Sequence, residues 1–189
     1  MLNDLVLKNR SYRRFDGSFP ISPILLKELV GLARICPSSR NQQALKFACV
    51  HEESQNRLVF GTLAWAGYLK DWSGPVRNEQ PTGYIIVLGD TRLGTRFDVD
   101  LGIASQTILL RAAESGLGGC MIASINKEEL RTRLKIPDYL EILLVLALGK
   151  PTETVVIDTM KNGEIRYWRD DDQVHHVPKR DLDDLLIEV

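Results

Sequence analysis

The chain has 189 residues, of which 44% are hydrophobic and 26% charged, and its formal net charge is −1. This length favours one domain, residues 1–189, over two domains. The near-neutral charge gives no general attraction to nucleic acid or to an anionic membrane. The apolar runs are far too short to span a bilayer, and the first ten residues lack a signal-peptide pattern, so we expect a cytoplasmic protein.

Cysteine and histidine are sparse. Cys36, Cys49 and Cys120 are odd in number and widely spaced in apolar surroundings, which favours reduced core thiols over disulfides or a zinc site. His175 and His176 are adjacent, so in a strand they would point to opposite sides and could not both bind one metal ion. We therefore expect no metal site. No Ser–His–Asp or Cys–His arrangement stands out either.

The hydrophobic pattern divides the chain into helices and strands. In chain order it predicts a helix over 2–9, a helix over 22–35, a strand over 45–50, a helix over 53–69, a strand over 83–90, a helix over 98–118, a strand over 119–124, a helix over 127–134, strands over 141–149 and 164–168, and a terminal helix or strand arm over 179–188. Ser22 can cap the second helix, and Pro23 suits its first position. Asn126 and Glu129 form a capping pair for the helix that follows them. Strands that alternate with helices indicate an α/β or α+β sheet covered on both faces.

Residues 98–118 form the most helical stretch of the chain. Its apolar positions cover more than one face, so we expect it to be buried on most sides. Gly102, Ala104 and Ser105 are small enough to let another backbone approach closely.

Glycines follow that helix in the stretch SGLGGCMIAS. A dinucleotide-binding fingerprint must follow a strand and open a helix, whereas here a helix precedes and a strand follows. Gly116, Gly118 and Gly119 are therefore interpreted as the end of the helix and the turn into the sheet. The strand end at residues 122–124 can still present backbone N–H groups to a ligand.

Two polar segments lie in the first quarter of the chain. The first, NRSYRRFD over residues 9–16, contains Arg10, Ser11 and Arg13. Arginine offers forked donors that suit a phosphate or a carbonyl-rich ring edge. Taken alone, however, this segment is better interpreted as a solvated basic loop.

The second segment, PSSRNQQ over residues 37–43, has consecutive hydrogen-bonding side chains that can bind phosphate oxygens, hydroxyls or the edge of a heterocycle. A loop whose serines merely cap turns is an equally good interpretation. Near the C-terminus, Lys179 and Arg180 form a basic pair flanked by acidic residues, and its alternative interpretation is a plain charged surface. A large anionic cofactor would explain all these features together, but composition and spacing do not identify it.

Taken together, these segments resemble the nitroreductase-like family of FMN-dependent oxidoreductases, over nearly the whole chain. RSYRRF resembles the Arg-Ser-x-Arg-x-Phe signature of that family, and PSSRNQQALKF resembles its Pro-Ser-x-x-Asn-x-Gln segment. DVDLGIASQTILLRAAESGLGG resembles its central helix, which ends in Gly-Leu-Gly. The three motifs also have the family's order and separation.

The resemblance implies an α/β (α+β) fold, with a central, mostly antiparallel or mixed sheet flanked by helices. It implies an intertwined homodimer with two FMN sites in its interface, each built from both chains. Arg10 and Ser11 would hold the phosphate region of FMN, and Arg13 would lie near the N1 and C2-carbonyl edge of its ring. The other implied FMN-binding residues are Ser38, Ser39 and Asn41 from the partner chain, Ala123 and Ser124 near flavin N5, and Lys179 or Arg180 near the phosphate.

The sequence departs from the family pattern at points that affect this site. Asn9 stands where many members have a second basic residue, so phosphate binding would depend more on Arg10 and the C-terminal pair. Trp65, Tyr68 and Trp72 lie where members differ most. These aromatic residues either shape the substrate side of the flavin or belong to the core, and aromatic residues at helical spacing are more often core.

The resemblance implies an enzyme that takes hydride from NADH or NADPH onto FMN N5 and passes electrons to a small, planar acceptor in the same site. FMN carries the chemistry, so no catalytic side chain is required. Flavin fragmentation or reductive dehalogenation would use the same fold, but each usually needs a lid, for which the chain has little room beyond residues 71–82. A flavin-binding or redox-sensing module and a structural dimer without cofactor are two further interpretations of the same residues.

Overall fold

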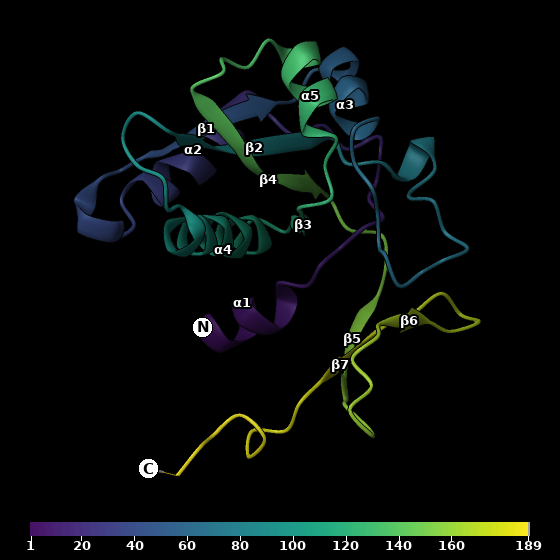
Figure 1. The fold of residues 1–189 in the computed structure, drawn as a ribbon. Coiled ribbons are helices and arrows are strands. Elements are labelled where there is room, and N and C mark those ends of the chain that lie inside the picture. Colours follow the sequence, from purple (N-terminus) through teal and green to yellow (C-terminus); the bar gives the residue numbers. More distant parts are fainter. Residues whose placement is uncertain (189) are drawn as a thin grey trace.

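The structure is a computed structural model that describes residues 1–188. It has a central four-stranded antiparallel sheet in the order β1-β2-β4-β3, and a smaller sheet in the order β5-β7-β6 set apart from it (Figure 1). The elements are α1 (Leu2–Lys8), α2 (Pro23–Arg34), β1 (Leu45–Val50), α3 (Glu53–Phe60), β2 (Gly83–Asp90), α4 (Asp98–Glu114), β3 (Gly118–Ile122), α5 (Lys127–Leu134), β4 (Leu140–Gly149), β5 (Val155–Thr159), β6 (Trp168–Arg169) and β7 (His175–Lys179), with short 3-10 turns at Ser39–Asn41 and Arg77–Glu79. The predicted fold class is confirmed.

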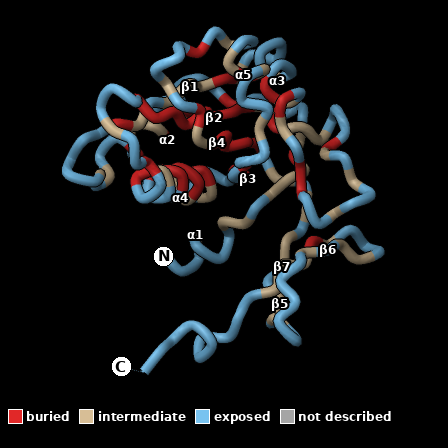
Figure 2. The backbone as a smooth tube through the Cα atoms, viewed as in Figure 1, coloured by how far each residue is buried: buried red, intermediate tan, exposed pale blue. Residues whose placement is uncertain are grey.

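The central strands β2 and β4 are buried because helices cover both faces of the sheet (Figures 1 and 2). Alternate residues of a strand point to opposite faces. Ile85 and Val87 accordingly pack with α2 and α4 on one face, whereas Tyr84 and Ile86 pack with α3 and α5 on the other. This arrangement explains why β2 has a continuous apolar sequence rather than an alternating one.

The predicted helix caps are present. Ser22 Oγ accepts a hydrogen bond from the backbone N–H of Leu25 at 3.1 Å, and α2 begins at the next residue, Pro23. Asn126 Oδ1 accepts from the backbone N–H of Glu129 at 3.2 Å at the start of α5. These local signals were sufficient to locate both helices.

The prediction of a helix over residues 53–69 was wrong beyond Phe60, where α3 ends. The backbone after it pairs with the end of the sheet instead of continuing the helix. Ala64 N–H donates to the carbonyl of Ser124 at 2.9 Å, and Asn126 N–H donates to the carbonyl of Thr62 at 2.8 Å. These long-range hydrogen bonds replace the helical ones, so the aromatic residues that follow lie in a loop.

The terminal predictions also need correction. Within residues 164–168 only Trp168 belongs to a strand, the two-residue β6. Residues 180–188 form neither a helix nor a strand, and contain a turn instead. Figure 2 shows this tail as exposed. Its exposed large apolar residues are Leu182, Leu185, Leu186 and Ile187.

Helix α4 is less buried than predicted. Ala104, Ser105 and Ile108 are buried against the core, but Val99 is 70% exposed and Ile103 36% exposed. The expectation of burial on most sides is therefore wrong for one chain, even though both α1 and α2 contact α4.

The described part of the chain, residues 1–188, has no helix long and apolar enough to cross a membrane. Its three cysteines are free thiols. Across those same residues, no group of three histidine, cysteine, aspartate or glutamate side chains is placed to hold a metal ion.

Candidate cofactor site

The basic segment at residues 9–16 runs along the edge of β3. Ser11 forms a parallel bridge with Gly119, and the backbone N–H of Tyr12 donates to the Gly119 carbonyl at 3.0 Å. Glycine is required at position 119, because a Cβ atom there would lie 2.7 Å from the carbonyl oxygen of Ala147. The close approach of three backbone segments thus places the basic segment beside the strand end.

A cavity of about 200 Å³ opens at this edge. Its walls include Arg13, the two residues Ala123 and Ser124 beyond β3, residues 64–67 and Tyr167. The structure therefore brings together three of the predicted site residues, from segments about 110 positions apart in the sequence.

The side chain of Arg13 is held in place by its neighbours. Its Nη1 lies 3.2 Å from Nε2 of His175 and donates to the carbonyl of Ser11 at 3.2 Å. Its guanidinium lies over the ring of Tyr167, 4.7 Å from the centroid. Its backbone N–H donates to the carboxylate of Glu153. The orientation of this cation is thus set by the protein itself.

His175 is fully buried behind Arg13. Burial and the positive charges of Arg13 and Arg169 lower its pKa to about 4. At neutral pH the ring is therefore uncharged, and its Nε2 can accept a hydrogen bond from Arg13. Sequence reasoning considered this histidine only as a metal ligand and missed this contact, since the two residues are 162 positions apart.

Arg10 lies beside the same strand edge. Its Nη2 donates to the carbonyl of Val6 at 2.6 Å, while its Nε is buried without a hydrogen-bond partner in the described part of the chain. The side chain of Ser11 is exposed. Arg10 therefore keeps one guanidinium N–H without an acceptor, and such a group is suited to hydrogen-bond an anion.

The second polar segment lies at the other end of α4. Ser39 N–H donates to Oδ1 of Asp100, in the first turn of that helix, at 2.8 Å. Ser38 Oγ accepts from the backbone N–H of Gln43 at 3.2 Å, and Asn41 is exposed. Because α4 has 17 residues and is thus about 25 Å long, one chain does not bring this segment to Arg13 (Figure 1).

The basic pair near the C-terminus lies in or next to the smaller sheet. Lys179 ends β7, where its carbonyl accepts from the backbone N–H of Met160 at 2.7 Å, and Arg180 follows it. Both side chains are exposed. In one chain, the pair lies away from the central sheet, on the segment that extends below it in Figure 1.

The three aromatic residues after α3 have different environments. Trp65 is 8% exposed and packs on Phe60, yet it also lines the cavity. Tyr68 is exposed and packs on the ring of Tyr167, with 4.9 Å between the centroids. Trp72 lies under the guanidinium of Arg169, with 4.3 Å from the cation to the ring centroid. Trp65 therefore serves both the core and the cavity wall.

Comparison with known proteins places these features in a family context. The model of the Nitroreductase family matches residues 81–150 of the chain. Among solved structures, the chain is similar to a candidate NADH dehydrogenase/NAD(P)H nitroreductase from Parabacteroides distasonis, with a TM-score of 0.67 and 25% identity over 86% of this chain and 92% of that one.

Two further structures have the same fold. A nitroreductase family protein from Clostridium novyi matches with a TM-score of 0.66 and 21% identity, over 94% of each chain. An FMN-dependent nitroreductase from Clostridium difficile matches with a TM-score of 0.63 and 20% identity, over 83% of this chain and 90% of that one. The resemblance seen in the sequence motifs is confirmed by these matches.

Proposed function

We propose that this chain, which has the nitroreductase fold and a segment of the nitroreductase family over residues 81–150, is an FMN-dependent oxidoreductase that uses NADH or NADPH. The observation that carries the proposal is the cavity between Arg13 and the end of β3, which combines an oriented cation with the exposed residues Ala123 and Ser124. FMN would supply the electron-transfer chemistry when bound.

The residues at the cavity fit the parts of FMN. A phosphate carries close to two negative charges at neutral pH, and Arg10 has a buried donor without a partner in residues 1–188. Arg13, held by Glu153 and by neutral His175, offers a cation to the carbonyl-rich edge of the ring. A fixed cation there stabilises the negative charge that accumulates on reduction. We also propose that Lys179 or Arg180 contacts the phosphate.

We propose a homodimer in which each site takes residues from both chains. The cavity in one chain is about 200 Å³, which leaves most of a mononucleotide uncovered. Ser38, Ser39 and Asn41 lie at the far end of α4, so they would complete the site of the partner chain. The exposed residues Val99, Gly102 and Ile103 of α4 support an interface there.

The acceptor is proposed to be a small, planar molecule that occupies the site in turn with the nicotinamide. Trp65 and Tyr68 lie at or beside the cavity and supply flat apolar surfaces against which a ring can pack. Cys120 also lines the cavity, but burial raises the pKa of its thiol, so it stays protonated and is not proposed as a nucleophile.

The test is to purify the protein, record its visible spectrum with and without added FMN, and mix the complex anaerobically with NADH and NADPH separately. We expect a bound flavin spectrum that bleaches with at least one nicotinamide. Protein that stays colourless and takes up no FMN would refute the proposal. Bound flavin that resists both nicotinamides would instead indicate a flavin-binding module.

A further inference from the structure

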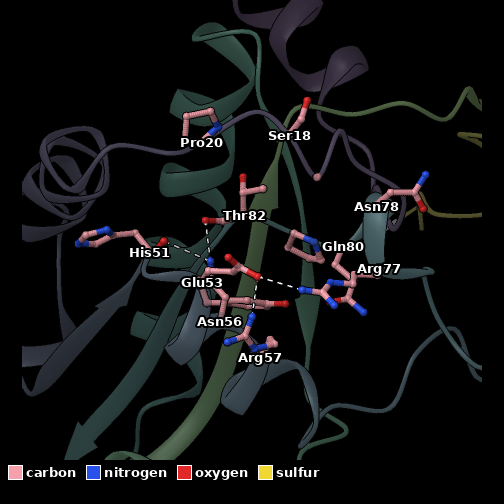
Figure 3. Close-up of a pocket in the computed structure, with 13 residues that line it drawn as sticks. Ser18, Pro20, His51, Glu53, Asn56, Arg57, Arg77, Asn78, Gln80 and Thr82 are labelled. Atoms are coloured by element: carbon pink, nitrogen blue, oxygen red, sulfur yellow. Dashed lines mark hydrogen bonds and ion pairs between the residues drawn. The ribbon is translucent and has the colours of Figure 1, made fainter.

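A second cavity, of about 620 Å³, lies at the start of β2, and its lining residues differ from those of the cofactor cavity (Figure 3). Its walls come from the loop at residues 17–20, from His51 and the first turns of α3, and from residues 77–84. This volume is in the range of small-molecule sites, which is roughly 300–1,000 Å³. The proposed function uses none of these residues.

The inner wall of this cavity has polar atoms without partners. Asn56 Nδ2 donates to the carbonyls of Thr82 at 2.9 Å and His51 at 3.3 Å. These bonds fix the orientation of the amide, so its Oδ1 remains an acceptor without a donor in the described part of the chain. Asn56 Oδ1, Thr82 Oγ1 and the hydroxyl of Tyr84 are buried and have no hydrogen-bond partner within residues 1–188. Tyr84 is 0% exposed. Buried polar groups nearly always have partners. These three atoms, from residues that line one cavity, are therefore candidate contacts for a ligand.

The rim of the cavity is positively charged. Arg57 Nη1 lies 2.5 Å and Arg77 Nη2 3.3 Å from the same oxygen, Oε1 of Glu53 (Figure 3). Two guanidinium groups thus share one carboxylate, which leaves a net charge of +1 and several free donor directions. Such a pair favours an anionic group over a cation.

We propose that this cavity binds a small organic anion that also carries a hydroxyl or amide group. The rim arginines Arg57 and Arg77 receive the carboxylate or phosphate. The hydroxyls of Thr82 and Tyr84 bond to the polar body of the ligand, and Asn56 Oδ1 accepts from its O–H or N–H. The site is independent of the flavin cavity and does not rest on the proposed function.

His51 provides a direct probe, because the chain has three histidines and this one lines the cavity. The ring signals of His51 are assigned with His51→Gln and followed by NMR in the full-length protein with excess FMN present. The probes are gluconate, malate and 3-phosphoglycerate, with acetate, inorganic phosphate and sorbitol as controls that each lack one half of the proposed chemistry. We expect a saturable shift of the His51 signals with at least one probe, and about tenfold weaker binding of the controls.

Variants then test the inner wall and the arginine rim of the cavity separately. Thr82→Val and Tyr84→Phe remove hydroxyls that have no partner in the described structure, so the fold should tolerate both, and each should weaken binding of the probe about tenfold. Arg57→Gln combined with Arg77→Gln should weaken it further. FMN uptake should be unchanged in all of them, with FMN-induced shifts confined to His175.

Three results would overturn the proposal. One is the absence of any His51 shift with all three probes. Another is unchanged binding in both the hydroxyl variants and the double arginine variant. The third is binding of acetate or inorganic phosphate as tight as that of the probes. Such binding would show that the inner wall does not contribute to recognition. A chain that fails to bind FMN would refute the proposed function and leave this test intact, since the His51 signals are read separately.

Discussion

Glu153 and Arg169 form a salt bridge of 2.9 Å between side chains that are 2% and 8% exposed. The carboxylate of Glu153 also accepts from the backbone N–H groups of Arg13 and Arg14. One buried carboxylate thus joins the basic segment at the N-terminus to the smaller sheet near the C-terminus. The position of Arg13 depends on this junction.

Replacing Glu153 by Gln should be strongly destabilising. It leaves the guanidinium of Arg169 buried without its counter-charge, and breaking a buried pair from one side costs about 3–5 kcal/mol. Urea unfolding followed by circular dichroism measures the change in the free energy of unfolding. The matched control is Glu114→Gln, which breaks an exposed ion pair. In that pair the side chain of Glu114 is 57% exposed and that of Arg111 is 33% exposed. The control should cost at most about 1 kcal/mol, and equal losses in both variants would contradict the prediction.

The pH dependence of stability should reveal the neutral state of His175. Its pKa is about 4 in the folded chain and returns to the ordinary value of 6.5 on unfolding. The unfolded chain therefore binds a proton that the folded chain does not, so stability from this group is present above pH 6.5 and is lost as the pH falls towards 4. The loss between about pH 7.5 and 4.5 should be roughly 2–3 kcal/mol.

His176 has to be removed for this measurement, because its pKa is shifted the opposite way. Hydrogen bonds to Asp170 and Asp158 raise it, so its contribution is present at low pH and is lost as the pH rises. The free energy of unfolding is therefore compared between His176→Gln and the double variant His175→Gln with His176→Gln. The single variant should lose stability faster as the pH falls. Parallel curves would show that His175 is not buried in its neutral form.

Much of the fold could be predicted from local patterns, because local physics determines those parts. The continuous apolar run at 83–90 and the capped start at Ser22 both have their structural cause within a few residues. Residues 61–69 could not be predicted in this way. Their apolar spacing fits a helix, but Ala64 and Thr62 form backbone hydrogen bonds with Ser124 and Asn126 instead. Nothing near residues 61–69 in the sequence indicates that partner.

In the candidate site, too, some residues could be predicted from sequence motifs and others could not. The predicted residues Arg13, Ala123 and Ser124 do meet at one cavity, and they were proposed from motifs that resemble a known family. Glu153 and His175, which orient Arg13, carry no motif and lie at least 140 positions away in the sequence. Their role follows from tertiary packing alone, so sequence reasoning had no signal for it. The assignment of each residue to FMN remains a prediction.

Replacing Arg10 by Ala should weaken FMN binding. The variant loses a charged partner of the phosphate, which costs about 1.5–3 kcal/mol, or roughly 10- to 100-fold in the dissociation constant. Quenching of flavin fluorescence on titration with protein measures this constant. Lys127→Ala removes an equal charge from the start of α5 and serves as the control. If the two variants bind FMN equally well, Arg10 does not hold the phosphate.

Replacing Gly102 by Leu should separate the chains without unfolding them. Gly102 lies on the exposed face of α4, and a Cβ atom there would meet no heavy atom within 4 Å in one chain. Leucine also favours a helix over glycine by roughly 0.5–1 kcal/mol, so the isolated chain should not lose stability. If a second backbone approaches this position, the added side chain must push it away. We therefore expect sedimentation to show a shift from dimer to monomer, with loss of bound FMN.

The control for this variant is Gln55→Leu, which places the same side chain on the exposed surface of α3, on the other face of the sheet. It should leave both the sedimentation coefficient and FMN binding unchanged. A Gly102→Leu protein that remains dimeric and retains its flavin would show that α4 is not the interface. A protein that becomes monomeric yet retains flavin would show that Ser38, Ser39 and Asn41 of a partner are not needed for binding, because only the dimer can bring them to Arg13.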